Sequence, residues 1–89
     1  MATNVPAYSL SEHAEDQLRK RKIPRFILEQ VLAEPQQVVE ERKGRTGYQS
    51  LIEVNGVPQV LRIIVEEGTP LTVVTLYYTD KVQKYWRTS

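Results

Sequence analysis

The sequence contains no cysteine, which excludes disulfide bonds and thiolate metal sites for this chain. Its 89 residues include one histidine, and no pair of carboxylates stands at the spacing of metal ligands. The four glycines are scattered through turns, unlike those of a nucleotide-binding loop, and no serine has the glycine neighbours of a hydrolase nucleophile. We therefore expect no metal and no cofactor. The chemistry that remains is proton transfer and phosphate binding.

Long apolar segments are also missing. No run approaches the ~20 residues that cross a bilayer, and the first residues, MATNVPAYSL, lack the basic start and apolar core of a signal peptide. We therefore expect a cytoplasmic protein. A hydrophobic fraction of 40% and a charged fraction of 26% are typical of a globular chain, and the length predicts one domain over residues 1–89, frayed at residues 1–7.

The N-terminal half of the sequence predicts two helices. Ser9 and Ser11 are both suitable N-caps for the first helix, which covers EHAEDQLRKRK. Ile23-Pro24 ends that helix, and PRFILEQVLAE predicts a second one, with apolar residues at helical spacing and Pro35 at its end. Residues 7–10 allow a short extended segment before the first helix.

From residue 36 the apolar period changes from helical to two, which predicts four strands, at residues 37–42, 48–54, 57–66 and 71–79. Asn55-Gly56 is a strong hairpin signal, and the short turns favour antiparallel neighbours. The predicted fold class is α+β: two N-terminal helices packed on one face of a four-stranded antiparallel sheet. The tail DKVQKYWRTS is basic and aromatic, and fits a last helical turn or a segment packed along the sheet.

The strand predicted at residues 71–79, LTVVTLYYT, organises the rest of the chain. Both of its faces are apolar, which favours a central position in the sheet. Strict alternation places Leu71, Val73, Thr75, Tyr77 and Thr79 on one face. Hydroxyl groups gather toward the C-terminal end of that face, so we expect a functional site there.

Three single residues are candidates for chemistry. His13 lies in the first turn of the predicted helix; histidine suits general acid or base catalysis, but a ring bonded to nearby backbone fits the same position. Arg21 shares the apolar stripe of the first helix, so it needs a phosphate or carboxylate partner. Arg62 stands among the apolar residues of VLRIIV. It either pairs with a carboxylate such as Glu53 or binds phosphate on the open face of the sheet.

Cations alternate with aromatic rings in two further segments. This mixture fits single-stranded nucleic acid, with cations on phosphates and rings stacked on bases. It fits a protein partner equally well, because Tyr, Trp and Arg dominate interface hot spots. The residues are Lys43, Arg45, Tyr48, Lys81, Lys84, Tyr85, Trp86 and Arg87.

Three short pieces, Ser11-x-His13-Ala14, Arg21-x-Ile23 and Val74-Thr75-x-Tyr77, together resemble a small prokaryotic family filed as a domain of unknown function. That family is similar to the RelE/ParE superfamily of type II toxins and to the barnase–colicin–RelE ribonuclease fold group. The resemblance covers residues 8–86.

The resemblance implies a RelE-like member of a toxin-antitoxin pair: a metal-independent endoribonuclease that acts on messenger or ribosome-bound RNA and has a cognate antitoxin. The ribose 2′-hydroxyl would attack the adjacent phosphate, with a base, an acid and a charge-stabilising cation supplied by the protein. The implied catalytic residues are His13, Arg21, Arg62 and Tyr77, and the implied RNA-binding residues are Arg45, Tyr48, Thr75 and Lys84. The alternatives are a non-catalytic RNA- or protein-binding module on the same fold, and a toxin that acts on another target through surface binding.

Overall fold

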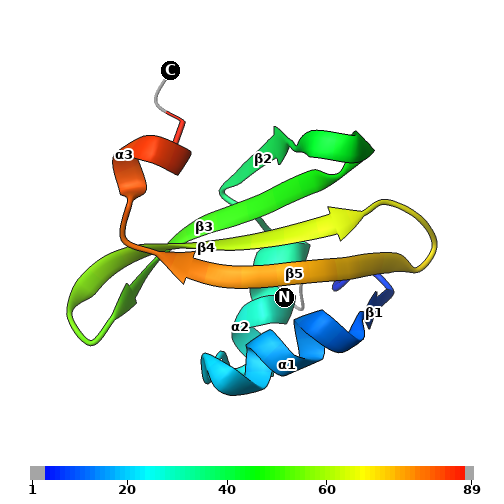
Figure 1. The fold of residues 1–89 in the computed structure, drawn as a ribbon, viewed down its shortest axis with the longest axis horizontal. Helices are drawn as coiled ribbons and strands as arrows, with labels where there is room; N and C mark the ends of the chain where they lie inside the picture. Colours follow the sequence, from blue (N-terminus) through cyan, green and yellow to red (C-terminus); the bar gives the residue numbers. More distant parts are fainter. Residues whose placement is uncertain (1–3, 88–89) are drawn as a thin grey trace.

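The computed structural model describes residues 4–87, so the predictions for residues 1–3 and for the last two residues of the tail lie outside the described chain. No helix in residues 4–87 has the length and apolar character that a bilayer crossing needs. In chain order the elements are β1 (Tyr8–Leu10), α1 (Glu12–Lys20), α2 (Arg25–Ala33), β2 (Gln37–Glu40), the 3-10 turn η1 (Arg42–Gly44), β3 (Thr46–Val54), β4 (Val57–Glu66), β5 (Leu71–Thr79) and α3 (Val82–Tyr85) (Figure 1).

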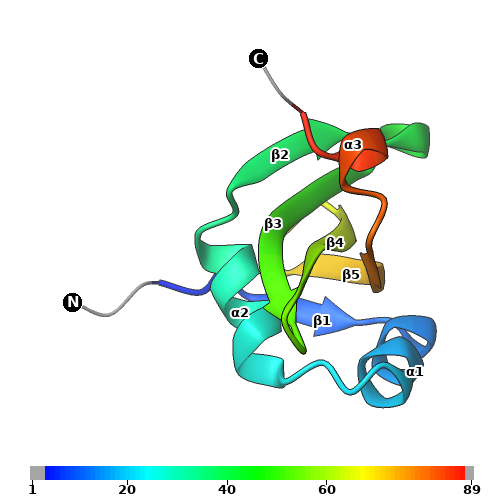
Figure 2. The same cartoon turned by 90° about the vertical axis from the view of Figure 1, so that its left-hand side faces the viewer.

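The predicted fold, two helices on one face of a four-stranded antiparallel sheet, is wrong in two respects. The sheet has five strands in the order β1-β5-β4-β3-β2, and it is mixed because β1 pairs parallel with β5. A third helix, α3, lies on the side of the sheet away from α1 and α2 (Figures 1 and 2). β1 has three residues and α3 has four, so neither is long enough to produce a periodic pattern in the sequence.

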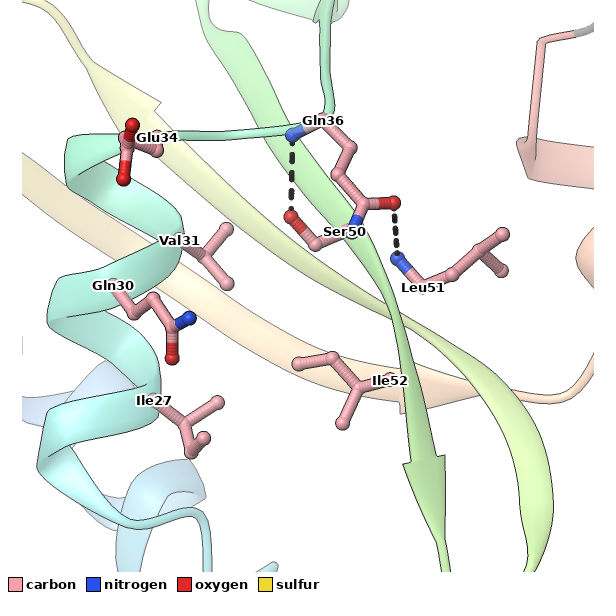
Figure 3. A pocket seen from close by; sticks show the side chains of 8 residues that line it. All are labelled: Ile27, Gln30, Val31, Glu34, Gln36, Ser50, Leu51 and Ile52. Carbon is pink, nitrogen blue, oxygen red and sulfur yellow. Dashed lines mark hydrogen bonds between the residues drawn. The ribbon is translucent and has the colours of Figure 1, made fainter.

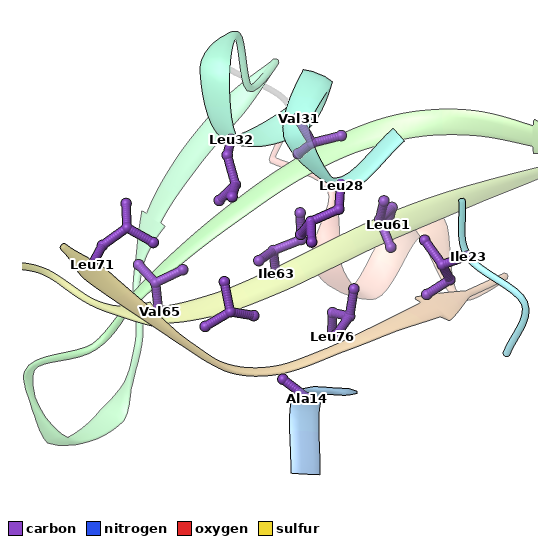
Figure 4. Packing of buried hydrophobic residues seen from close by; sticks show 11 residues of the cluster. Ala14, Ile23, Leu28, Val31, Leu32, Leu61, Ile63, Val65, Leu71 and Leu76 are labelled. Atoms are coloured by element: carbon purple, nitrogen blue, oxygen red, sulfur yellow. The ribbon is translucent and has the colours of Figure 1, made fainter. Parts of the chain in front are cut away.

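The apolar core lies between the sheet and the helices α1 and α2. β4 contributes Leu61, Ile63 and Val65, each with 0% of its surface exposed, and Leu76 of β5 lies close to Ala14 of α1 (Figure 4). Fully burying one aliphatic side chain of this kind contributes about 1.5–3 kcal/mol. α2 supplies the remaining cover through Leu28, Val31 and Leu32.

A β-bulge in β5 changes which of its side chains share a face. The register of β5 against β4 shifts after Ile64, which leaves Val74 as an extra residue. Before the bulge Leu71 and Val73 face the core, and after it Leu76 does. The strict alternation predicted over residues 71–79 is therefore wrong from the bulge onward. Thr75 and Tyr77 therefore lie on the open face, whereas Leu71 and Val73 face the core.

Ser11 fixes the start of α1 at this bulge. Its Oγ accepts a hydrogen bond from Ala14 N at 3.0 Å and donates one to Val74 O at 2.8 Å, while its backbone N donates to Val73 O at 3.0 Å. Ser11 is thus the N-cap, and Ser9 is not. Ala14 is fully buried, and its small side chain allows the helix to approach the sheet closely. The first turn of α1 is therefore held beside β5.

Candidate functional site

Four polar side chains form a row across the open face of the sheet. Gln37, Gln49, Arg62 and Tyr77 are aligned in register on β2, β3, β4 and β5. Directly opposed residues on one sheet face have Cβ atoms about 4.5–5.5 Å apart, so long side chains in such a row contact one another.

Arg62 is the centre of this row and is only 5% exposed. Its Nε donates to Gln49 Oε1 at 3.0 Å, its Nη1 donates to Tyr77 OH at 2.6 Å, and its Nη2 forms an ion pair with the carboxylate of Glu41. A buried guanidinium needs such partners because an unpaired buried charge costs several kcal/mol. The carboxylate partner is thus Glu41 and not Glu53, and the pair lies on the open face.

The helix α3 packs over Arg62. The Tyr85 ring centroid lies 4.5 Å from Arg62 Cζ, and Tyr85 O accepts a hydrogen bond from Gln49 Nε2 at 2.9 Å. The rings of Tyr77 and Tyr85 meet edge to face at 6.4 Å, and Lys84 Nζ lies 5.3 Å from the Tyr85 ring. The polar row therefore anchors the C-terminal segment to the sheet, beside β2 and β3 in Figure 2.

Gly47 leaves room for the Glu41 carboxylate. A Cβ atom at position 47 would lie 3.1 Å from Glu41 Oε2 and 3.1 Å from Val39 Cγ2. The carboxylate is held by Arg62, so it cannot move aside without weakening the ion pair.

We expect Gly47→Ala to lower the free energy of unfolding by about 1–2 kcal/mol, because the cost of overpacking exceeds the gain from a less flexible unfolded chain. Urea denaturation measures this change. In a Glu41→Ala background the same substitution should cost less, because the carboxylate is gone. An equal loss of stability in both backgrounds would show that the added methyl group does not clash with Glu41.

His13 reaches the open face from the edge of β5. Its Nε2 is hydrogen-bonded to Thr75 Oγ1 at 3.1 Å. Thr75 pairs with Ile64, and Tyr77 with Arg62, so both β5 residues lie on the open face. Residues two apart on a strand are about 6.6 Å from each other. The imidazole, the threonine hydroxyl and the phenol therefore occupy neighbouring places.

Ile64 lies in the middle of these groups and is 8% exposed. It pairs with Gly47 on one side and with Thr75 on the other. The Glu41 side chain lies against Gly47 and His13 is bonded to Thr75, so the carboxylate and the imidazole flank Ile64 from opposite sides. Two strand spacings, about 9.6 Å, separate β3 from β5. We call the groups around Ile64 the open-face cluster: Glu41, His13, Thr75, Arg62 and Tyr77.

Arg21 does not belong to this cluster. It is the C-cap of α1, it is exposed, and its Nε donates to Gln17 Oε1 at 2.8 Å. The prediction that it lies on the packing side is wrong because the helix ends there, and Ile23 is buried instead. The eight positions from His13 to Arg21 correspond to about 12 Å along a helix axis.

Two of the predicted RNA-binding residues contact the end of β4 and the turn that follows it. Arg45 Nε lies 3.4 Å from Glu66 Oε2, one row beyond the cluster on the open face. Tyr48 packs against the core on the helical face and donates its OH to Glu67 Oε2 at 2.8 Å. Tyr48 is therefore on the opposite side of the sheet from Arg62.

Tyr48 makes the stability of the fold sensitive to high pH. Burial, and then the hydrogen bond to Glu67, raise the pKa of Tyr48 from 10.0 to about 12. The unfolded chain loses this proton first as the pH rises, so stability falls between about pH 10 and pH 12. We expect Tyr48→Phe to reduce the slope of unfolding free energy against pH in that range, as measured by urea denaturation. A residual slope should remain, because the pKa values of Tyr8 and Tyr78 are also raised. An unchanged slope would contradict this assignment.

A surface hollow beside His13 is predominantly acidic. It is lined by Glu12, His13, Glu15, Asp16 and Arg19. A hydrogen bond from Lys20 lowers the pKa of Asp16, and Arg19 Nη2 lies 2.8 Å from Asp16 Oδ1. Because these carboxylates repel phosphate, the side of His13 that suits an anion is the one toward the sheet.

Sequence reasoning missed Glu41, Gln37 and Gln49 as parts of the site, and it named Tyr85 only among the cations and aromatic rings that fit a nucleic acid or a protein partner. A partial signal was present, because Gln37, Val39 and Glu41 alternate in QVVEER and so share a face. Nothing in the sequence indicates that this face meets Arg62, since that contact depends on the order of the strands.

The fold and the open-face cluster define a small α+β domain with a polar centre on one face of its sheet. The chain belongs to the family described as Domain of unknown function (DUF4258), which matches residues 10–85 and so includes the whole cluster. No curated protein and no solved structure matches the chain. Within residues 4–87, no three His, Cys, Asp or Glu side chains are grouped so that they could hold a metal ion.

Proposed function

We propose that this protein is a toxin-like, metal-independent endoribonuclease and that the open-face cluster is its active site. The observation that carries the proposal is the position of Glu41 and His13 on opposite sides of Ile64, beside Arg62 and Tyr77. RNA cleavage by the 2′-hydroxyl uses a base, an acid and a group that stabilises the developing charge, and these residue types supply all three.

In the proposed reaction the Glu41 carboxylate removes the proton of the ribose 2′-hydroxyl. The 2′-oxygen then bonds to the adjacent phosphorus, the bond from phosphorus to the 5′-oxygen breaks, and protonated His13 donates its proton to that leaving oxygen. The products are a 2′,3′-cyclic phosphate and a 5′-hydroxyl end. Thr75 orients the imidazole through its hydrogen bond.

Tyr77 supplies the hydrogen bond to the charged phosphorane. A guanidinium has donors only, so Tyr77 OH must accept from Arg62, and its own proton is free to be donated. Arg62 is buried and acts as a positioning residue: it orients Glu41 and Tyr77 and places a positive charge behind both. Lys84 and Arg45 flank the cluster and would guide the RNA backbone.

The toxin class rests on the similarity between the RelE/ParE superfamily and the domain-of-unknown-function family that the three pieces resemble. Two of these pieces, Ser11-x-His13-Ala14 and Val74-Thr75-x-Tyr77, meet at the bulge of β5. A cognate antitoxin protein is the partner that this class implies.

The test is cleavage of a labelled single-stranded RNA by purified protein in the presence of EDTA. We expect cut products with 2′,3′-cyclic phosphate ends, and no cutting of the same RNA carrying 2′-O-methyl groups throughout, because the nucleophile is then blocked. RNA that stays intact under all conditions would overturn the ribonuclease proposal.

A non-catalytic RNA- or protein-binding module is the second candidate. It is favoured by the environment of Arg62, whose three nitrogens each contact a protein acceptor and whose guanidinium lies beside the Tyr85 ring. In this alternative the polar row serves to anchor α3. RNA that is bound, as measured by fluorescence anisotropy, but never cut would support it.

A further inference from the structure

The edge of β3 is only partly covered. β2 pairs with β3 as far as Gln37 opposite Gln49. β3 continues to Val54, and over residues 51–54 its only strand partner in the described chain is β4. An exposed strand edge of this kind is a template for another extended segment.

The side chain of Gln36 occupies the first position of this edge. Leu51 N donates to Gln36 Oε1 at 3.2 Å, and Gln36 N donates to Ser50 Oγ at 3.2 Å (Figure 3). The N–H of Leu51 therefore points away from β4, and by alternation the N–H of Glu53 does too. The glutamine amide thus takes the place that a carbonyl of a neighbouring strand would fill.

A cavity of about 250 Å³ lies directly beside this edge, between α2 and β3. Ile27, Val31 and Ile52 face the space between the two elements (Figure 3). The volume is below the ~300–1,000 Å³ typical of small-molecule sites and suits an apolar side chain carried on a peptide. The full lining is Ile27, Gln30, Val31, Glu34, Gln36, Ser50, Leu51 and Ile52.

We propose that this edge binds an extended segment of another protein as an added β-strand. Main-chain hydrogen bonds to Leu51 and Glu53 would displace the Gln36 amide, and the residue opposite Ile52 would place an aliphatic side chain in the cavity. Its neighbours along the segment would face the other side, where the Leu51 side chain is 38% exposed.

The charge of the β3 edge indicates which residues the partner segment carries. Glu53 is the charged residue of the edge and lies on the opposite face of β3 from Ile52, so the segment carries lysine or arginine directly next to its aliphatic anchor, opposite Glu53. A second copy of this chain suits the edge poorly, because two-fold pairing would bring two acidic edges together. The proposal is independent of RNA cleavage, since the edge and the cavity contain no residue of the open-face cluster.

The probe is the synthetic peptide acetyl-Thr-Val-Lys-Leu-Lys-Val-Thr-amide, titrated into the full chain and followed by NMR; its lysines flank the leucine anchor, so one of them lies opposite Glu53. We expect the amide signals of residues 51–54 to shift and their hydrogen exchange to slow. Glu53→Pro should weaken binding at least ~10-fold, because proline removes an outward N–H but no ladder bond to β4. The control Glu53→Gln keeps the backbone donor and should change the affinity less than ~3-fold, since one rim charge contributes little.

Gln30→Trp provides a second test that leaves the strand intact. Gln30 is exposed at the rim of the cavity, so a tryptophan there should fill the cavity and weaken peptide binding at least ~10-fold. Binding that is unaffected by both Glu53→Pro and Gln30→Trp overturns the proposal. So does the absence of binding at millimolar peptide, or a dimer in sedimentation equilibrium that forms through residues 51–54.

Discussion

Replacing Arg62 with alanine is expected to lower the free energy of unfolding by about 3–5 kcal/mol, the usual cost of leaving one member of a buried ion pair alone. The substitution removes the donors that Glu41, Gln49 and Tyr77 use, and it removes the cation beside the Tyr85 ring. Domains of this kind have about 5–15 kcal/mol of stability in total, so the loss is a large fraction of it. Urea denaturation at neutral pH measures the change.

Two comparisons make this prediction specific. Arg21→Ala removes an exposed guanidinium that donates to the Gln17 side chain, so it should change stability by less than about 0.5 kcal/mol. Arg62→Met combined with Glu41→Met replaces both charges with apolar groups of similar length, and should recover much of the loss. A cost below about 1 kcal/mol for Arg62→Ala would show that the polar row does not hold this face together.

Loosening of α3 is the structural consequence that accompanies this loss. Tyr85 is held by the Gln49 side chain and by the guanidinium of Arg62. In Arg62→Ala we therefore expect limited trypsin digestion to cut after Lys84 sooner than in the native protein. Cleavage after Lys84 that is accelerated more than cleavage at the other lysines and arginines separates a local effect on the C-terminal segment from a general loss of stability.

The longer elements follow from local patterns in the sequence. The predictions of β4 at Val57–Glu66 and of β5 at Leu71–Thr79 are confirmed residue for residue. The hairpin between β3 and β4 is confirmed too, because Asn55 and Gly56 both adopt the positive φ that this turn requires.

The remaining parts of the fold depend on contacts between distant segments. The bulge at Val74 cannot be found by alternation, because it breaks the alternation on which the prediction rests. β1 is a strand only because the edge of β5 at Leu71–Val73 is there to pair with it.

The candidate site divides in the same way: one part can be predicted from the local sequence, and the other part depends on contacts between distant segments. Arg62 stands out in the sequence because a charge in an apolar strand needs a partner, and that inference requires only the pattern of VLRIIV. Which carboxylate pairs with Arg62 depends on the three-dimensional arrangement of the strands. Glu41 reaches Arg62 across Gly47, so the contact needs the order of β2, β3 and β4 and a glycine at one position of β3.

Substituting the proposed proton-transfer groups should have the largest effect on activity. If the open-face cluster cuts RNA, His13→Gln and Glu41→Gln should each reduce the single-turnover cleavage rate by about 10²–10⁴-fold, the usual contribution of a positioned acid or base. His13→Gln is preferred to alanine because a glutamine amide can still reach Thr75 Oγ1, yet it cannot transfer a proton. The substitution therefore separates proton transfer from a structural role of the ring.

The effects of the two substitutions on the cleavage rate should not multiply. Both groups act on one phosphoryl transfer, so the double variant should be little slower than the slower single variant, as is usual for catalytic groups that act as a unit. Lys22→Ala, an exposed cation beyond the end of α1, is the matched control and should cut at the native rate. Cleavage at the native rate by His13→Gln would show that the imidazole of the native protein transfers no proton and serves only in the hydrogen bond to Thr75. Glu41 would then have no proton donor opposite it across Ile64, and the two-group mechanism would not hold.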